Sequence, residues 1–215
     1  MGSDTIKNIF IRLMALMHRP IYAARLQELV KSIVPHLEEG DQVLDVGCGC
    51  GTLGYELMRC QTAPGGLLVV GIERCPSDGE PIRVDAYDGR TFPYSDRSFD
   101  VVILADVLHH ESDPDHLLQE CMRVSRSLLI IKDHKVEGLF GRLRVSLMDW
   151  AANAPYDVPC LYRYWTRSEW EALRVRPQFK MVEERHSMCL YPPAINQVFG
   201  GRLQYFAVIR ISQPA

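Results

Sequence analysis

A glycine-rich loop that begins with a single carboxylate offers the clearest arrangement of residues for chemistry. The run Val43–Gly51, with the sequence VLDVGCGCG, joins a short apolar stretch to a segment with helical periodicity. Glycines allow a ligand to approach the backbone closely, and the first N–H groups of a helix are free to bind an anionic group. The run therefore predicts a ligand-binding loop in which Asp45 is the charged side chain.

The charge of Asp45 bears on which cofactor this loop binds. Residues Gly49–Gly54 also match the pattern GxGxxG, which is typical of nicotinamide dinucleotide sites. A dinucleotide would place its anionic pyrophosphate near Asp45, and two like charges about 4 Å apart at an effective dielectric near 20 repel by about 4 kcal/mol. S-adenosylmethionine carries an ammonium and a sulfonium, which a carboxylate attracts. The loop thus favours S-adenosylmethionine, unless Asp45 only accepts hydrogen bonds from backbone donors of the turn.

Glu73 follows the apolar run Leu67–Ile72, which predicts a buried parallel strand. It lies 22 residues after Gly51. An ionised carboxylate at such a strand end can accept hydrogen bonds from both hydroxyls of a ribose. Enzymes that bind nicotinamide dinucleotides have the same feature, so Glu73 does not separate the two cofactors. A glutamate exposed at the end of a strand is the simpler interpretation, and it stays open.

Two further runs strengthen the preference for S-adenosylmethionine through a resemblance to a known family. Together with Val43–Gly51, the runs Asp88–Asp100 and Val102–His110 resemble the motifs of class I S-adenosylmethionine-dependent methyltransferases, over about residues 40–132. The ending Leu-His-His is similar to the type 11 group that contains ubiquinone and menaquinone C-methyltransferases. The resemblance implies a methyltransferase with S-adenosylmethionine as cofactor and S-adenosylhomocysteine as product.

The resemblance also assigns cofactor-binding roles to residues of this sequence. It implies that the glycine loop binds the methionine portion and Glu73 the ribose, while Asp88 and the N–H of Gly89 bind the adenine. Asp85 is an alternative adenine acceptor, although its spacing to Pro93 fits the motif less well. Residues after the fourth strand should lie beside the cofactor, because ligands bind at the carboxyl ends of parallel strands. The full predicted set is Asp45, Gly47, Cys48, Gly49, Gly51, Glu73, Asp88, Gly89, Ala105, Asp106 and Leu108.

Histidines near two strand ends are the candidate catalytic groups. His109 and His110 follow the fourth predicted strand, and Asp133 and His134 follow the fifth. An imidazole can act as a general base near neutral pH, and Asp133 is placed to orient His134 by a hydrogen bond. The alternatives are a histidine that caps the next helix and a solvated turn at 133–134. No cluster visible in the sequence requires a metal ion.

The elements that position these residues alternate between strand and helix. This alternation predicts an α/β fold with a Rossmann-like, doubly wound, mostly parallel sheet. N-terminal helices, a helical insertion and one antiparallel strand near the C-terminus complete the expected architecture. The strands are expected near residues 43–46, 67–72, 82–84, 101–104, 128–131, 181–189 and 204–211, with a loop between the last two.

Two of the predicted helices have clear start signals. Asp113 precedes Pro114 at the beginning of a helix that should run to Val124, because aspartate is favoured at the N-cap and proline at the first helical position. Thr166 and Glu169 have the three-residue spacing of a capping box, in which each side chain accepts a hydrogen bond from the other residue's backbone N–H. A second helix is therefore expected to begin after Thr166.

We expect a single methyltransferase domain over residues 1–215. Within it, residues 1–39 form an N-terminal helical cap and residues 40–132 the cofactor-binding core. Residues 133–175 form an insertion on the substrate side, and residues 176–215 form the closing strands.

The two variable segments leave alternatives open. The N-terminal segment is predicted to form helices over 5–18 and 20–37, which either close over the active site as a lid or pack against the sheet, another subunit or a membrane surface. In the insertion, arginines interleave with aromatic residues, which fits either an acceptor pocket or an aromatic minicore with a solvated basic face. These residues are Arg142, Arg144, Arg163, Arg167, Trp150, Tyr156, Tyr162, Tyr164 and Trp165.

Composition argues against several other classes. The chain of 215 residues has a net charge of -3 and an isoelectric point near 6.2, so no overall positive field attracts nucleic acid. No uncharged run reaches the roughly 18 residues that span a bilayer. Seven scattered cysteines without a signal peptide indicate a reducing, cytoplasmic setting. Cys48 and Cys50 lack the second ligand pair of a zinc site.

These observations predict an S-adenosylmethionine-dependent methyltransferase that acts on a small-molecule acceptor through an oxygen, nitrogen or carbon nucleophile. The acceptor is expected to be apolar or anionic, and neither nucleic acid nor a transmembrane segment is expected. The oligomeric state stays open, with a homodimer among the arrangements. Two rivals are an NAD(P)-dependent oxidoreductase and a non-catalytic S-adenosylmethionine-binding module. The fold does not identify the acceptor, because one fold serves many substrates.

Overall fold

The computed structural model describes residues 20–153 and 160–212. They form a mixed sheet in the order β3-β2-β1-β4-β5-β8-β7, with β6 paired to β5. Neighbours from β3 to β5 are parallel, whereas β8 runs antiparallel to both β5 and β7. The strands are β1 (Gln42–Val46), β2 (Leu68–Glu73), β3 (Val84–Ala86), β4 (Phe99–Ala105), β5 (Ser125–Val136), β6 (Trp165–Thr166), β7 (Phe179–Arg185) and β8 (Gln204–Ile211).

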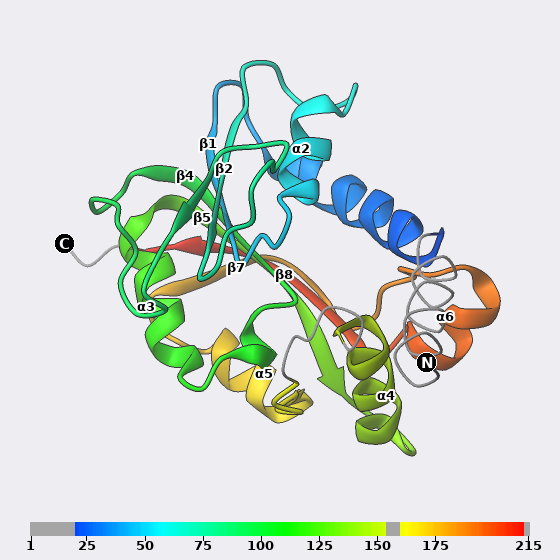
Figure 1. Ribbon diagram of the computed structural model, residues 1–215. Helices are drawn as coiled ribbons and strands as arrows, with labels where there is room; N and C mark the ends of the chain where they lie inside the picture. Colours follow the sequence, from blue (N-terminus) through cyan, green and yellow to red (C-terminus); the bar gives the residue numbers. More distant parts are fainter. Residues whose placement is uncertain (1–19, 154–159, 213–215) are drawn as a thin grey trace, which may run out of the picture.

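Helices cover both faces of this sheet, as Figure 1 shows. A helix over residues 20–33 lies with α2 on one face, and α3 and α5 lie on the other. Helix α4 packs against α6 and β5 at one end of the sheet. The bounds are η1 (Val34–His36), α2 (Thr52–Arg59), η2 (Leu108–His110), α3 (Pro114–Val124), α4 (Gly141–Asn153), α5 (Arg167–Arg174) and α6 (Pro193–Phe199).

Alternate residues of the central strands face opposite helical layers. On β1, Val43 belongs to the same core as Leu29 of helix 20–33 and Leu57 of α2. Its neighbour Leu44 belongs to the other core, with Leu118 of α3. Strands that bury both faces have continuous apolar runs, which is the pattern the sequence shows. The layering and the single antiparallel strand β8 confirm the predicted α/β, doubly wound fold class.

Both predicted helix starts are confirmed. The Asp113 side chain accepts a hydrogen bond from the backbone N–H of His116, and α3 runs over the predicted residues. At α5, the Thr166 side chain accepts from the backbone N–H of Glu169 while the Glu169 carboxylate accepts from the N–H of Thr166. Local side-chain chemistry determines these two helix boundaries, because the hydrogen bonds lie within one turn.

Several predicted boundaries are wrong. Strand β5 does not end near 131 but continues to Val136, because it pairs with β8 up to His134 and with β6 at Lys135 and Val136. The expected loop between the closing strands contains α6. Strand β3 begins at Val84, two residues later than the predicted start, and β7 ends at Arg185.

Other expectations concern the chain ends and the domain division. The predicted helix over 5–18 lies outside the described residues, and residues 20–33 of the second predicted N-terminal helix are helical. Among the described helices, none combines the length and apolar character needed to cross a bilayer. The division into cap, core, insertion and closing strands stays a prediction.

The core on the α5 side depends on a stack of aromatic rings. Trp170 is completely buried, and its ring lies 4.0 Å from the ring of Tyr205 at an interplanar angle of 19°. The ring of Trp165 lies 4.5 Å from Trp170. Ring contacts of this kind, one stacked and one tilted, add to the stabilisation from buried apolar area. Trp170 thus joins α5 to β8 and β6.

We expect Trp170→Ala to lower the free energy of unfolding by about 3–5 kcal/mol, because it opens a cavity between α5 and the sheet. Urea denaturation followed by circular dichroism measures this loss. The matched control is Trp150→Ala, since Trp150 is 45% exposed on α4 and its truncation should change stability by only about 0.5 kcal/mol. Equal losses in the two variants would contradict this account of the core.

Candidate functional site

The glycine loop lies at the carboxyl end of β1, beside the ends of β2 and β4. The N–H of Gly47 donates to the carbonyl of Ile72 at 2.9 Å, and the N–H of Gly51 donates to the carbonyl of Cys48 at 3.0 Å. A Cβ added at Gly47 would lie 2.8 Å from the side chain of Val107, so the loop and the segment that follows β4 approach too closely for a side chain there. At Gly49, which has φ +54°, a Cβ would meet nothing within 4 Å. The loop is therefore packed on one side and open at Gly49.

Asp45 is a buried carboxylate beneath this loop. Its exposed fraction is 2%, and its Oδ2 atom has no hydrogen-bond partner within the described residues. Burial and the nearby charge of Glu73 raise the pKa of Asp45 to about 7, although Arg25 counteracts this shift. A buried carboxylate without a full complement of partners is costly to keep ionised. A cationic ligand group at this position would offset that cost.

Glu73 lies beside the loop, as the sequence predicts. Its Oε2 atom accepts a hydrogen bond from the N–H of Gly49 at 3.0 Å, and Oε1 accepts from the N–H of Arg74 at 2.9 Å. The three predicted cofactor residues Asp45, Gly49 and Glu73 thus come together at one edge of the sheet. Cys48 differs from the others, because its side chain packs against Gly71 of β2, so only its backbone can line the loop.

The predicted adenine residues lie in the loop after β3. Asp88 is exposed, and its Oδ1 atom accepts hydrogen bonds from the N–H groups of Arg90 and Thr91, both at 2.8 Å. These hydrogen bonds hold the pKa of Asp88 below its usual value. The rival Asp85 instead accepts from the hydroxyl of Tyr94 at 2.9 Å. In this structure Asp88 stabilises its own turn, and its role toward adenine stays a prediction.

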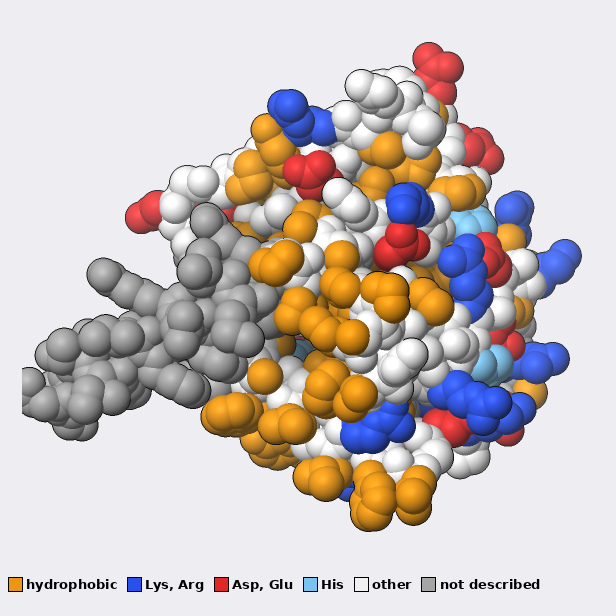
Figure 2. Space-filling view, turned by 90° about the vertical axis from the view of Figure 1, so that its right-hand side faces the viewer, with side chains coloured by type: hydrophobic (Ala, Val, Ile, Leu, Met, Phe, Trp, Pro, Cys, Tyr) orange, Lys and Arg blue, Asp and Glu red, His pale blue; other side chains and the backbone are white. Residues whose placement is uncertain are grey.

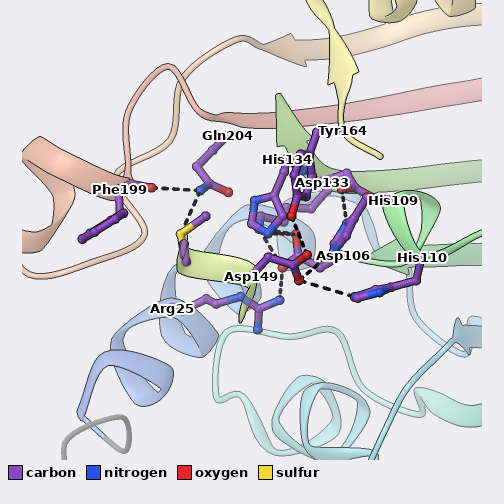
Figure 3. Close-up of polar contacts among 12 residues, drawn as sticks. Arg25, Asp106, His109, His110, Asp133, His134, Asp149, Tyr164, Phe199 and Gln204 are labelled. Atoms are coloured by element: carbon purple, nitrogen blue, oxygen red, sulfur yellow. Dashed lines mark hydrogen bonds and ion pairs between the residues drawn. The ribbon is translucent and has the colours of Figure 1, made fainter. Parts of the chain in front are cut away.

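A group of polar residues, all but His110 buried, lies close to the ends of β4 and β5 (Figure 3). We call this group the histidine cluster. His109 and Asp133 are joined by a 2.6 Å hydrogen bond between Nδ1 and Oδ1. The Nε2 atom of His109 lies 3.6 Å from Oδ1 of Asp149, and Nε2 of His110 lies 3.9 Å from the same oxygen. The hydroxyl of Tyr164 donates to Oδ2 of Asp149 at 2.5 Å. The cluster consists of His109, His110, Asp133, His134, Asp149 and Tyr164.

The structure corrects the expected arrangement of Asp133 and His134. These residues do not form a turn after the fifth strand, because they lie within β5 and are buried. Asp133 does not orient the His134 imidazole. Its carboxylate binds His109, and only the backbone N–H of His134 donates to it, at 2.6 Å.

The three imidazoles differ in charge. Burial alone would lower the pKa of His109, but the carboxylates of Asp133 and Asp149 raise it to about 10. Burial and the charge of His109 lower the pKa of His110. Burial, with the charges of Lys132 and His109, lowers the pKa of His134 to about 3 despite Asp106. At neutral pH the cluster therefore holds His109 as a cation and the other two imidazoles as neutral rings.

Asp106, predicted to lie beside the cofactor, is held by two cations. Its carboxylate accepts from Nζ of Lys132 at 2.5 and 2.7 Å and from the guanidinium of Arg25. Lys132 is almost completely buried on β5, and Arg25 comes from helix 20–33 (Figure 3). Burial would raise the pKa of Asp106, but the two cations hold it well below its usual value. This ion triad links helix 20–33 to β5 and to the residue that follows β4.

Sequence reasoning missed the roles of four residues in this region. Arg25 was expected only as part of a helix, Lys132 only as a neighbour of Asp133, and Tyr164 only as part of an acceptor pocket or an aromatic minicore. Asp149 lies on α4 without any motif around it. Their partners are distant in the chain, so no local spacing could identify them.

The remaining predicted residues behave as follows. Ala105 is partly buried at the end of β4, and Leu108 is buried in η2. In the insertion, arginines bind backbone carbonyls, as Arg142 does at Tyr162 and Arg163 does at Ser112. Tyr164 and Trp165 are buried, which favours the aromatic minicore over an open pocket, while Tyr156 lies outside the described residues.

We expect Lys132→Met to lower the free energy of unfolding by about 3–5 kcal/mol, because it removes one partner of a buried ion pair and leaves the Asp106 charge undercompensated. The double variant with Asp106→Asn should lose less than the sum of the two single variants, since each removes the same interaction. Guanidinium denaturation of the three proteins measures both effects. Additive losses would show that the pair is not coupled.

Comparisons with known proteins identify the family through one family model and the fold through solved structures. A family model described as Methionine biosynthesis protein MetW matches residues 27–159. The 27-O-demethylrifamycin SV methyltransferase of Amycolatopsis mediterranei is 33% identical over 115 residues, which cover 47% of this chain and 40% of that protein. The ubiquinone/menaquinone biosynthesis C-methyltransferase UbiE of Neisseria meningitidis is 28% identical over 113 residues, covering 47% of this chain and 46% of that protein. The chain matches less than half the length of these curated relatives.

Solved structures are similar over nearly the whole chain. A chain of the Haloferax volcanii complex between the Trm112 methyltransferase activator and a methyltransferase has a TM-score of 0.65 at 15% identity, covering 97% of this chain and 96% of that one. A SAM-dependent methyltransferase from Aquifex aeolicus has a TM-score of 0.59 at 16% identity, covering 94% and 98%. At these identities the likeness establishes the class I methyltransferase fold and nothing finer.

Proposed function

Because this chain belongs to the MetW family and has the class I methyltransferase fold, we propose that it transfers the methyl group of S-adenosylmethionine to a small-molecule acceptor. The observation that carries this proposal is the buried Asp45 carboxylate under the glycine loop, with one oxygen unpartnered within the described residues. The methyltransferase names of its relatives support the same class of reaction.

The described residues at the loop fit this cofactor. Asp45 would attract its cationic methionine portion, and the open space at Gly49 leaves room for a ligand against the backbone. Glu73 already accepts a hydrogen bond at the loop, and its carboxylate can accept from ribose hydroxyls in the same way. When bound, S-adenosylmethionine supplies a methyl group on a sulfonium, which leaves as a neutral thioether once a nucleophile attacks the methyl carbon. The protein's main task is therefore to align the acceptor.

We assign the acceptor side to the histidine cluster, and we retain His109, His110, Asp133 and His134 as the proposed catalytic residues. Nδ1 of His110 and Nδ1 of His134 are buried without a hydrogen-bond partner within the described residues. Such polar atoms can bind a polar group of an acceptor. The cluster lies next to Asp106, at the strand end that lies beside the ligand in sheets of this type.

The two rival functions receive less support. A nicotinamide dinucleotide would bring a pyrophosphate toward the Asp45 carboxylate, where like charges repel. A module that only binds S-adenosylmethionine would not need the buried ionisable side chains of the histidine cluster, which lie outside the glycine loop. We also propose a reducing, cytoplasmic location, which the odd number and scattered spacing of the cysteines in the sequence favour.

Calorimetry of ligand binding tests the proposal directly. We expect the protein to bind S-adenosylhomocysteine and not NAD(H), and methyl-labelled S-adenosylmethionine with a library of small hydroxyl, amine and carbon acids should yield a labelled product. Binding of NAD(H) alone would establish the oxidoreductase instead. Normal binding of S-adenosylhomocysteine without transfer to any acceptor would favour the non-catalytic module.

We expect Asp45→Asn to weaken S-adenosylhomocysteine binding at least tenfold, because the variant keeps the shape of the side chain and removes its charge. The matched control is Asp78→Asn, since Asp78 is exposed outside the site. Asp88→Ala tests the predicted adenine residue in the same titration. If Asp45→Asn and Asp88→Ala both bind like the parent protein, the cofactor site is assigned to the wrong residues.

The affinity for S-adenosylhomocysteine should also depend on pH. Because the pKa of Asp45 is raised to about 7, the carboxyl is protonated below that pH and must lose its proton before it can attract the ligand's ammonium group. Affinity should therefore rise with pH, by up to about tenfold per unit below pH 7, and level off above it. Calorimetry in buffers of different ionisation enthalpy measures the proton released. A slope that persists unchanged in Asp45→Asn would assign the effect to another group.

A further inference from the structure

We propose that His109, His110 and Asp149 bind a divalent transition-metal ion. Nε2 of His109 and Nε2 of His110 both point toward Oδ1 of Asp149 (Figure 3). The three candidate ligand atoms lie within 4.8 Å of one another. The two histidines are neighbours in η2, whereas Asp149 comes from α4, so the fold alone brings them together. The proposal rests on these side chains and not on the proposed methyl transfer.

The distances fit a shared ion better than direct hydrogen bonds. Separations of 3.6 and 3.9 Å between the imidazole nitrogens and the Asp149 oxygen exceed the range of hydrogen bonds. An ion with bonds of about 2.1 Å in tetrahedral geometry holds its ligand atoms about 3.4 Å apart. Small side-chain rotations therefore convert the observed arrangement into a coordination site.

Partners behind the ligands hold them in the orientation that coordination requires. The Nδ1 atom of His109 is bonded to Asp133 at 2.6 Å, which directs Nε2 toward Asp149. The Tyr164 hydroxyl donates to Oδ2 of Asp149 at 2.5 Å, and Oδ1, which faces the imidazoles, accepts one hydrogen bond from Nδ2 of Asn153 at 2.6 Å. Metal-binding histidines commonly donate their other N–H to a carboxylate, and such supporting partners strengthen metal affinity.

The charges of the cluster are compatible with a divalent ion, because the ion would take the place of the His109 proton. Asp133 and Asp149 are both about 1% exposed, and within the described residues their ion-pair partners are imidazoles of the cluster. Buried carboxylates are paired with cations or coordinate metals. On binding, the ion would replace the Nε2 proton of His109, which leaves to solvent, and the ion would then balance both carboxylates. The alternative trio of Asp106, His109 and His134 suits an ion less well, because Lys132 and Arg25 already neutralise Asp106.

The ligand set indicates the class of ion. Two imidazoles and one carboxylate suit zinc, iron or cobalt, whereas magnesium and calcium prefer oxygen ligands. Three protein ligands leave at least one coordination position for water or for an oxygen of a bound molecule. The side chain of His110 is 25% exposed, which gives the ion a route from solvent. An oxygen acceptor bound there would lose its proton to water more readily, because the ion stabilises the oxyanion.

Cobalt(II) titration of the metal-free, tag-free full chain tests the site without cofactor or acceptor. We expect visible absorption bands from one equivalent of cobalt, and their loss when zinc is added, while magnesium displaces nothing. The variants His110→Gln and Asp149→Asn should each weaken cobalt binding at least 100-fold. Tyr164→Phe should weaken it about tenfold, because it removes a supporting partner. The matched control His116→Gln, which replaces a histidine on α3, should bind like the parent protein.

Two measurements distinguish a variant that misfolds from a variant that only lacks a metal-binding side chain. Circular dichroism and S-adenosylhomocysteine binding report whether each variant retains the fold and the glycine loop. A protein that binds less than one equivalent of cobalt, or whose His110→Gln and Asp149→Asn variants bind cobalt normally, overturns the metal site. The histidine cluster would then be a hydrogen-bonded charge network in which a cationic His109 bridges two carboxylates. Neither outcome changes the expected cofactor binding, so failure here is distinct from failure of the proposed function.

Discussion

This structure depends on one electrostatic requirement. Each carboxylate that is buried near the carboxyl ends of the parallel strands needs a positive charge beside it. Parallel strands bring their carboxyl ends together, and this chain places Asp45, Asp106, Asp133 and Asp149 in or beside that region with little exposure to water. An unpaired buried charge costs several kcal/mol. Asp106 is balanced by Lys132 and Arg25, and Asp133 by His109. Because each buried carboxylate needs a cation, charge pairing determines which residues from distant parts of the chain lie in contact at the site.

Asp45 differs from the other carboxylates in this respect. Arg25 influences it from a distance, but no lysine or arginine within the described residues forms an ion pair with it. The chain supplies cations where the acid has a structural role and leaves this acid undercompensated under the glycine loop. This contrast is why a positively charged ligand fits the loop better than a diphosphate, and why the family assignment and the local chemistry point to the same cofactor.

The part of the site around the glycine loop could be predicted, because it depends on residues that are close together in the sequence. The glycine loop and the capped starts of α3 and α5 depend on residues a few positions apart, so spacing identified them, and the family resemblance added Glu73. The other part depends on contacts between distant segments. Arg25 meets Asp106 from 81 residues away, and Asp149 meets His109 only because α4 packs beside β5.

The length of β5 illustrates the same limit. Its charged segment Lys132–Lys135 resembles a solvated turn in sequence, because polar residues usually end a strand. In the structure β8 and β6 provide hydrogen-bond partners for the backbone of this segment, and ion pairs satisfy its side chains. Tertiary pairing thus overrides the local polar pattern, a result that no window of neighbouring residues can reveal.

The triad of Arg25, Lys132 and Asp106 has a consequence for how such chains diverge. The buried carboxylate of Asp106 pairs with two cations, so replacing any one of the three residues leaves a buried charge without its full set of partners. Related sequences that have lost the carboxylate at position 106 should therefore also have lost the lysine at position 132. Positions 106 and 132 should covary when related sequences are aligned. The residue pairs found there would show in which branches of the family the ion pair is retained.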